Sequence, residues 1–458
     1  MQHIKPNSPH ARDIAYHMHP QTNLSAHEQI GPHIIERGQG IYVEDDNGKQ
    51  YIEGLAGLWC TSLGFSEKRL VKAAHTQMKQ LPYYHSFAHK TEHPVIDLAE
   101  KLVKMAPGSM SKAFFTNSGS EANDTQVKLV RYYNNLRGRP EKKKIIARLG
   151  AYHGITIAAG SLTGLPYAHK FFDLPMEGIL HTSCPHQYHH SLPDESEDEF
   201  TDRMIKDLED LILREGPETV AAFIAEPVLG AGGVILPPKG YFQKVQALLK
   251  EHDILFIADE VICGFGRTGN MFGSETYGIE PDMISVAKAL SSAYQPIGAV
   301  LISEEIYKVI VTGSEKVGTF GTGFTYSGHP VAAAVALEAI NIYQEKSFLP
   351  HIHSVSPRFQ ERLNRFIDHP HVGEVRGVGL IGAIEFVKNK SSSENFDPSL
   401  KIGPRLMAMA AEHGLIIRAL VNDTIAFCPP LIITESQIDE MFGRFEKAVD
   451  EFNPEFKI

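Results

Sequence analysis

The chain is predicted to adopt an α/β fold, in which a large domain with a mainly parallel central sheet is followed by a smaller α+β domain. Two observations predict this architecture. Between residues 113 and 302, short apolar runs alternate with segments of helical periodicity, which is the pattern of a doubly wound sheet flanked by helices. After Pro330 one long helical segment is followed by strand-like and helical segments in mixed order, which is typical of an α+β unit.

The elements are expected in the following order. Residues 40–53 alternate apolar and polar side chains around Asn47-Gly48, which predicts a β-hairpin. Amphipathic helices are predicted over 67–80 and 94–105, and the acidic segment 192–202 is predicted to be a solvated connection. The predicted strands of the large domain are 113–116, 144–148, 220–225, 254–258, 283–286 and 299–302. The smaller domain is predicted to contain a helix from Pro330, strands within 374–387 and 416–427, and helices over 402–413 and from 436.

These elements divide the chain into four parts. An N-terminal arm with a short helix is expected over residues 1–40, and residues 41–70 are assigned to the small domain. Residues 71–330 are expected to form the large domain, and residues 331–458 the rest of the small one. A chain of 458 residues is long enough for this division.

Composition excludes several classes of protein. The net charge of −11 argues against a nucleic-acid partner, which would require a basic surface. No apolar run is long enough to cross a bilayer, and the first residues lack the apolar core of a signal peptide. The four cysteines form no CxxC pair and no disulfide framework. A cytoplasmic protein without a membrane partner is therefore expected.

One histidine-rich segment contains residue types that bind metals. His181, Cys184, His186, His189 and His190 lie within ten residues. They do not follow the HExxH or paired CxxC spacing of zinc sites. We therefore expect no metal, and a solvated loop.

The stretch Ile254–Lys288 carries the main chemical signal. Its first strand delivers Asp259 at the carboxyl end, and a second apolar run, 283–287, delivers Lys288. In open α/β sheets, ligands bind at this edge. A buried carboxylate facing a desolvated lysine is the arrangement that pyridoxal phosphate (PLP) chemistry requires, because the lysine binds the cofactor and the carboxylate keeps the pyridine nitrogen protonated. Lys288 and Asp259 are the predicted catalytic residues.

Other strand ends supply further candidates. Ser118, Gly119 and Ser120 stand at a helix start, where backbone N–H groups bind phosphate, although an ordinary serine N-cap explains the pattern equally well. Around the cofactor ring, Tyr152 is suited to stacking on one face and Val261 can reach the other. The remaining candidates are His153 as a hydrogen-bonding or structural residue, Glu226 at a strand end, Thr325 as a phosphate contact and Arg418 as a partner for a substrate carboxylate or a structural ion pair.

The same stretch also contains a dinucleotide-binding pattern. Gly264-Phe-Gly266-Arg-Thr-Gly269 matches G-x-G-x-x-G, which would indicate an NAD-dependent dehydrogenase. The pattern is meaningful only if a helix opens at the third glycine. The residues that follow contain two further glycines and a proline, which disfavour a helix.

Taken together, SGSEAN, YHG, AEP, DEVICGFGRTG, the lysine in AKAL and GFTYSGHP resemble the class III (omega) aminotransferases of PLP fold type I. The resemblance extends over residues 40–450. It implies that Lys288 binds PLP covalently and that Asp259 pairs with the ring nitrogen. It further implies phosphate contacts from Gly119 and Ser120, a ring held between Tyr152 and Val261, and a contact from Thr325 to the phosphate of the neighbouring subunit.

Trp59 and Arg418 resemble residues of omega-aminotransferases that accept amines and use pyruvate, and Phe87 is expected to act across a dimer. The resemblance implies a homodimer, or a dimer of dimers, with shared active sites. It implies transfer of an amino group from a primary amine or ω-amino acid to a 2-oxo acid, with pyruvate as the expected acceptor, by a ping-pong mechanism. A PLP-dependent aminomutase or decarboxylase remains an alternative. Diamines such as putrescine, β-alanine, taurine and aralkyl amines all fit as donors.

Overall fold

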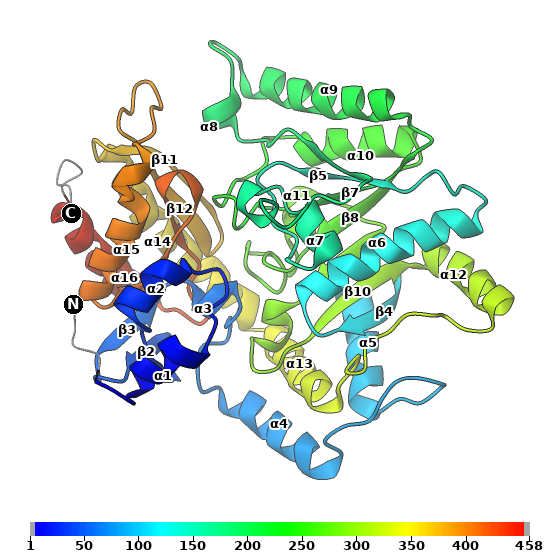
Figure 1. Ribbon diagram of the computed structural model, residues 1–458, viewed down its shortest axis with the longest axis horizontal. Helices are drawn as coiled ribbons and strands as arrows, with labels where there is room; N and C mark the ends of the chain where they lie inside the picture. The colour runs from blue at the N-terminus through cyan, green and yellow to red at the C-terminus, as the bar shows by residue number, and fades with distance from the viewer. Residues whose placement is uncertain (1–4, 453–458) are drawn as a thin grey trace.

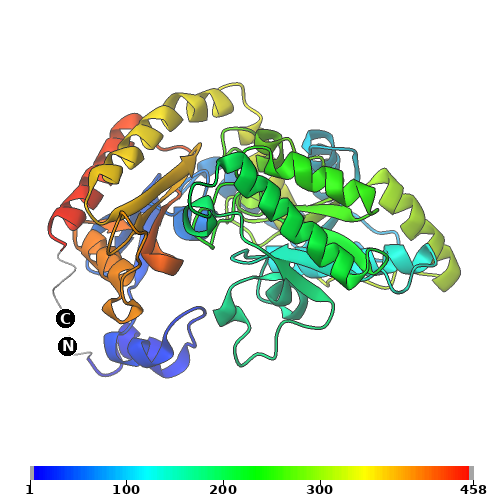
Figure 2. The ribbon, with the colours of Figure 1, turned by 90° about the horizontal axis from the view of Figure 1, so that it is seen from above.

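The computed structural model describes residues 5–452 of the 458-residue chain. It consists of a large α/β part on one side and a smaller part built on two four-stranded sheets on the other (Figure 1). The first helices of the chain lie beside the smaller part, as both ribbon views show (Figures 1 and 2). Within residues 5–452, no helix combines the length and apolar composition needed to span a membrane.

The large part contains a seven-stranded sheet. Neighbouring strands are parallel except at β10, which runs antiparallel to both of its neighbours. The prediction of a mainly parallel sheet is therefore confirmed. In spatial order the strands are β4 (Met110–Thr116), β10 (Gly298–Ser303), β9 (Met283–Val286), β8 (Leu255–Asp259), β7 (Val220–Ala225), β5 (Lys144–Arg148) and β6 (Ile179–Thr182).

Helices cover both faces of this sheet because its strands are apolar on both sides. Along β7, Phe223 and Ala225 belong to one hydrophobic cluster, whereas Ala222 and Ile224 belong to the other. The second cluster is completed by α6 (Gly119–Leu136), α7 (Ile157–Leu162) and α12 (Glu304–Val317). The first cluster is completed by α9 (Glu197–Glu215), α10 (Tyr241–Glu251) and α13 (Pro330–Tyr343), and α4 (Lys68–Gln80) and α5 (His93–Met105) lie against α13.

The smaller part joins segments from both ends of the chain. One antiparallel sheet has the order β11 (Val372–Val378), β12 (Ile381–Phe386), β15 (Thr424–Phe427), β14 (Arg418–Ala419). The other has the order β1 (Ile35–Gln39), β2 (Tyr42–Asp45), β3 (Gln50–Glu53), β13 (Leu415–Ile416), and only the β3–β13 pair is parallel. The helices of this part are α14 (Phe348–Asn364), α15 (Ile402–Glu412) and α16 (Glu435–Asp450).

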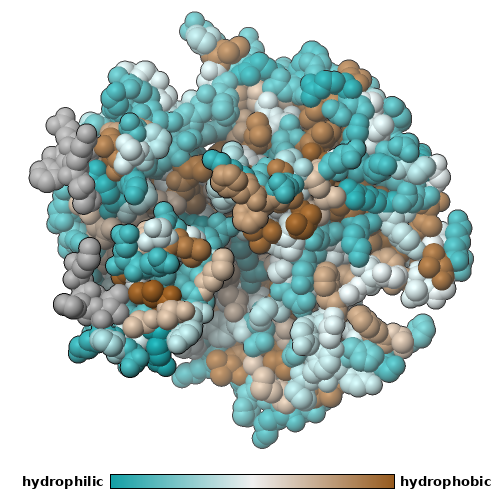
Figure 3. Space-filling model, in the orientation of Figure 1, coloured by the Kyte–Doolittle hydropathy of each residue, from teal (hydrophilic) through white to brown (hydrophobic). Residues whose placement is uncertain are grey.

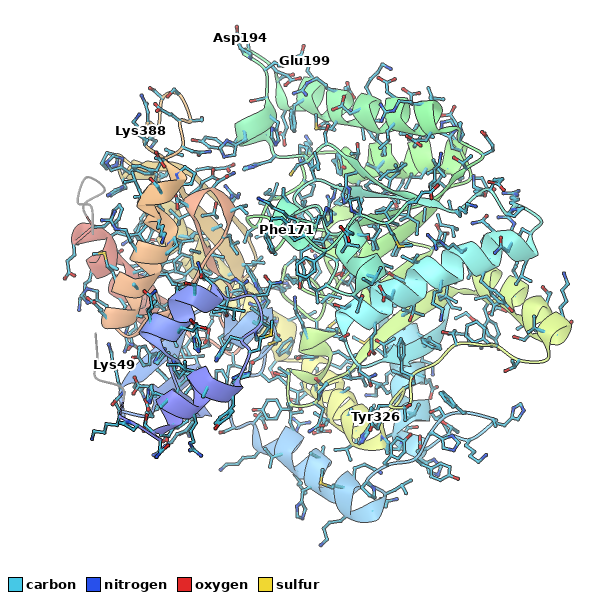
Figure 4. All side chains as sticks on the ribbon, in the orientation of Figure 1. Lys49, Phe171, Asp194, Glu199, Tyr326 and Lys388 are labelled. Carbon is cyan, nitrogen blue, oxygen red and sulfur yellow. The ribbon has the colours of Figure 1, made fainter. Side chains whose placement is uncertain are left out.

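The N-terminal hairpin is also attached at its tip. Lys49 lies at the turn between β2 and β3 and is labelled in Figure 4. Its Nζ donates to the carbonyl oxygens of Ala411 and Glu412, at 2.9 and 3.0 Å. These are carbonyls of the last turn of α15, where the helix dipole favours a cation.

Two sequence predictions are corrected by the structure. The arm contains two helices, α1 (Pro9–Tyr16) and α2 (Leu24–Ile30), rather than one. The acidic segment 192–202 is a connection only in its first half, because α9 begins at Glu197 with Ser196 as its N-cap. The Ser196 hydroxyl and the Glu199 carboxylate form a capping box, a helix-start signal that the sequence contained. Figure 4 labels Asp194, in the connection before α9, and Glu199, in the first turn of the helix.

Candidate active site

The carboxyl ends of the central strands surround a cavity of about 330 Å³. Asp259 ends β8 and lies opposite Ser285 of the neighbouring parallel strand β9, and Lys288 follows β9 by two residues. The face of the molecule is hollowed between the two parts, and hydrophobic side chains border the hollow (Figure 3). The predicted residues that line the cavity are Ser118, Gly119, Ser120, Tyr152, His153, Glu226, Asp259, Val261 and Lys288.

Asp259 is buried and accepts hydrogen bonds on both carboxylate oxygens. Its Oδ2 lies 2.8 Å from Nδ1 of His153 and 2.8 Å from Nδ2 of Asn123, and its Oδ1 lies 3.1 Å from the Val261 N–H. Asn123 was missed by the sequence analysis. It lies one helical turn after Ser120, so it shares that residue's face of α6, and this spacing was the available signal. Asp259 is thus fixed in one orientation at the cavity wall.

Lys288 follows the neighbouring strand, β9, and lines the same cavity as Asp259. It opens a short 3₁₀ helix, η2 (Lys288–Ser291), and has a φ of 47°, in the left-handed region. Burial lowers the pKa of its amine from the ordinary lysine value, with a smaller opposing effect from Cys60 and Asp259. A lowered pKa increases the fraction of neutral amine, which is the form that acts as nucleophile and base.

The start of α6 provides a site for an anion. Ser118 is the N-cap, and its hydroxyl accepts from the Glu121 N–H at 3.1 Å, so the serine N-cap that the sequence allowed is present. The N–H groups that follow a cap have no partner within the helix and attract negative charge. A Cβ on Gly119 would lie 3.1 Å from both Cγ atoms of Val261. Glycine therefore keeps this part of the cavity open.

The loop that carries Tyr152 is held by a second buried carboxylate. Glu226 accepts from the Tyr152 N–H at 3.0 Å and from the Gly230 N–H at 2.9 Å, and burial raises the pKa of Glu226. Burial also raises the pKa of Tyr152 and of Tyr167, and the nearby positive charge of Arg418 opposes the increase. Arg418 is therefore close enough to both tyrosines to act on their charge, although of these three residues only Tyr152 lines the cavity. Tyr167 was not among the predicted site residues.

Four predicted site residues, Arg418 among them, do not line the cavity. Trp59 is buried in a hydrophobic cluster that also contains Ile262, and Ile262 lines the cavity. Phe87 and Thr325 are exposed on the surface of the chain. Their two loops are joined there, since the Tyr83 hydroxyl donates to the Thr325 carbonyl at 2.6 Å and a Cβ on Gly323 would lie 2.8 Å from the Phe87 ring.

The dinucleotide-binding interpretation is not supported by the structure. The chain forms turns through Gly264–Gly269, and the next helix, α11 (Gly273–Tyr277), begins four residues later. Within the loop, the buried Arg267 donates to the carbonyl oxygens of Leu380 and Pro429, at 2.9 and 2.7 Å. This glycine-rich loop therefore connects the large part to the small part and opens no helix for a phosphate.

The prediction of a solvated loop around His181–His190 is wrong. His186 and Cys184 are buried, and His186 Nε2 lies 2.8 Å from Oε2 of Glu374 on β11. His189 is likewise hydrogen-bonded to Glu385 on β12. The contacts are long-range, so spacing along the chain carried no sign of them.

The residues present fit PLP. The α6 start suits a phosphate, Asp259 suits a protonated ring nitrogen, and Lys288 suits an aldehyde carbon, all around one cavity. Fold and site together define a PLP-dependent enzyme.

Comparison with known proteins extends this conclusion. A family model described as aminotransferase class-III matches residues 24–449. The mitochondrial gamma aminobutyrate transaminase 1 of Solanum lycopersicum is 56% identical over 423 residues, covering 92% of this chain and 82% of the relative. Vanillin aminotransferase of Capsicum annuum is 55% identical over 419 residues, 91% of each chain. The omega transaminase of Pseudomonas jessenii, solved in complex with PMP, superposes with a TM-score of 0.96 at 54% identity, covering 97% of this chain and 98% of that one. The chain belongs to the class III aminotransferases, which use PLP.

Proposed function

We propose that this aminotransferase moves the amino group of a primary amine or ω-amino acid to pyruvate in two half-reactions. The observation that carries the proposal is the placement of Lys288 and Asp259 at the ends of adjacent strands around one cavity that also contains the α6 start. The names of the relatives support the donor class, because they include gamma aminobutyrate transaminases and omega transaminases.

The chemistry follows from the side chains. PLP, when bound, withdraws electrons from the carbon that carries the transferred nitrogen. The Lys288 amine, whose pKa is lowered by burial, takes a proton from that carbon and delivers it to the cofactor. Asp259 accepts the hydrogen bond of the ring N–H, while Asn123 and His153 hold its carboxylate in place. Arg418 binds the carboxylate of the acceptor.

An absorption experiment tests the proposed cycle. The visible band of the bound cofactor is expected to disappear when a primary amine is added and to return when pyruvate is added. Lys288→Ala is expected to lose both the band and turnover while remaining folded. Reaction with the amine but no recovery with pyruvate would exclude pyruvate as the acceptor. Product formed without any keto acid would instead indicate an aminomutase or a decarboxylase.

We also propose that the active sites are shared in a homodimer. The exposed loops that carry Phe87 and Thr325 do not reach this chain's own cavity but form one joined surface, and Tyr326 projects from it (Figure 4). In a symmetric dimer this surface closes the cavity of the second copy.

Complementation between two inactive variants tests this arrangement. Lys288→Ala and Thr325→Asp are each expected to be inactive, because one lacks the amine and the other places a negative charge beside the phosphate. When the two are unfolded and refolded together, hybrid dimers contain one site with both residues intact, so activity is expected to return. No recovery in verified hybrid dimers would show that Thr325 serves its own chain.

A further inference from the structure

The N-terminal arm contains a cluster of three imidazoles around a single carboxylate. Asp13 Oδ1 lies 3.0 Å from Nδ1 of His17, and Asp13 Oδ2 lies 2.7 Å from Nε2 of His19 and 3.0 Å from Nε2 of His27. The rings are close together, with centroids 4.2 Å apart for His17 and His19 and 4.1 Å apart for His19 and His27. We propose that this cluster is a binding site for a transition-metal dication such as Zn²⁺.

The ligand set is suited to zinc. Imidazole nitrogen and carboxylate oxygen are both zinc ligands, and four of them complete the tetrahedral coordination of a structural site. Metal–ligand bonds of about 2.0–2.1 Å place neighbouring ligand atoms of a tetrahedron about 3.4 Å apart. The nitrogen–oxygen distances of 2.7–3.0 Å must open by about 0.4–0.7 Å to reach that spacing. The ligand atoms of Asp13, His17 and His19 already lie within 4.8 Å of one another.

The chain around the cluster also points to an ion. Asp13 lies in α1, His17 is the C-cap of that helix, and His27 lies in the last turn of α2. Neither helix has a fully buried side chain, and helices of eight and seven residues are marginal on their own. A metal bound to ligands from both helices would cross-link them where a hydrophobic core does not.

The second histidine–carboxylate cluster differs in one decisive respect. His186, His189 and Glu385 also lie close enough to hold an ion. There, however, Arg376 donates to Glu385 at 2.8 Å and to Glu374, so a guanidinium already supplies the positive charge. Among the described residues, histidines alone are hydrogen-bonded or paired with Asp13. The arm cluster therefore has a carboxylate with no permanent cation beside it.

The site is separate from the catalytic cavity. None of its four residues lines that cavity, and the arm lies beside the smaller part of the molecule (Figure 2). The metal is therefore assigned to the arm and not to this chain's catalytic cavity.

Metal titration of the complete, PLP-loaded protein without a polyhistidine tag tests the proposal. After treatment with a chelator, ZnCl₂ is titrated by calorimetry, and CoCl₂ is titrated by its visible absorption, which reports tetrahedral coordination. One equivalent of metal is expected per chain. Asp13→Asn, His19→Ala and His27→Ala are each expected to weaken binding by at least tenfold, since even residues that only support ligands are worth about 10–100-fold.

Two histidines of the same arm provide matched controls. His10 and His33 each face a single carboxylate, those of Asp46 and Asp45, at 3.5 Å. His10→Ala and His33→Ala are expected to leave the affinity and the cobalt spectrum unchanged. The unaltered cofactor band verifies that every variant is folded. Absence of a saturable equivalent, or equal losses in the controls and in the cluster variants, would overturn the proposal.

Discussion

Replacing Gly154 with alanine tests whether the loop after β5 and the start of α6 are fitted to each other around the phosphate position. Gly154 has a φ of 128°, which side-chain-bearing residues rarely adopt, and such strain costs about 1–3 kcal/mol. A Cβ there would lie 2.5 Å from Ser120 Oγ, 2.9 Å from Ser120 Cα and 2.9 Å from the Ala159 Cβ. Relieving that overlap costs about 1–3 kcal/mol more.

Gly154→Ala is therefore expected to lower the free energy of unfolding by about 2–6 kcal/mol in urea titrations. It is also expected to weaken PLP binding, because Ser120 must move away from the cavity. Gly178→Ala is the matched control, since Gly178 has a φ of 85° but no atom within 4 Å of the added Cβ. The control should lose only the backbone cost of about 1–2 kcal/mol and keep its cofactor affinity. Equal losses of stability in the two variants, or unchanged PLP affinity in Gly154→Ala, would refute the steric argument.

Three further substitutions test two predicted site residues and Glu260, a buried carboxylate next to Asp259 in the chain. Burial raises the pKa of Glu260 from 4.5 to about 7, so its stabilising contribution is full below pH 4.5 and is lost as the pH rises through 7. Urea titrations across this pH range should show a smaller decrease in stability for Glu260→Gln, and an unchanged slope would contradict the assignment. Arg418→Ala should raise the KM for pyruvate about 10–100-fold, because one or two charge-assisted hydrogen bonds are lost. The KM of an amine donor that lacks a carboxylate should change little. Asp259→Asn should lower kcat by about 100-fold or more in steady-state assays, and near-normal turnover would remove Asp259 from the mechanism.

The strands of the central sheet were predictable from the sequence because they are buried on both faces. β5, β7 and β9 were predicted at their observed bounds, since a continuous apolar run between turn residues has a clear start and end. The carboxyl ends of β8 and β9 then located Asp259 and Lys288. The sequence also argued correctly against a dinucleotide-binding site, because the residues after Gly269 disfavour a helix.

Contacts between distant segments were not predictable. The burial of His186 depends on Glu374, and nothing near His186 in the sequence indicates that contact. Asn123 was overlooked because its spacing from Ser120 indicates only a shared face of the helix, and its role depends on the position of Asp259, which that spacing does not show. Thr325 could be assigned to a neighbouring subunit only through resemblance, since the sequence around it does not indicate that it lies on the surface, away from this chain's cavity.

The parallel pairing of β3 with β13 has a consequence for how the chain folds. Residues 50–53 are synthesised long before their partner, residues 415–416. During that interval β3 has an open edge, which is a site for incorrect strand pairing. All the strands of the large sheet lie between residues 110 and 303, so that sheet can form first. The small sheet is completed only afterwards, when β13 pairs with β3.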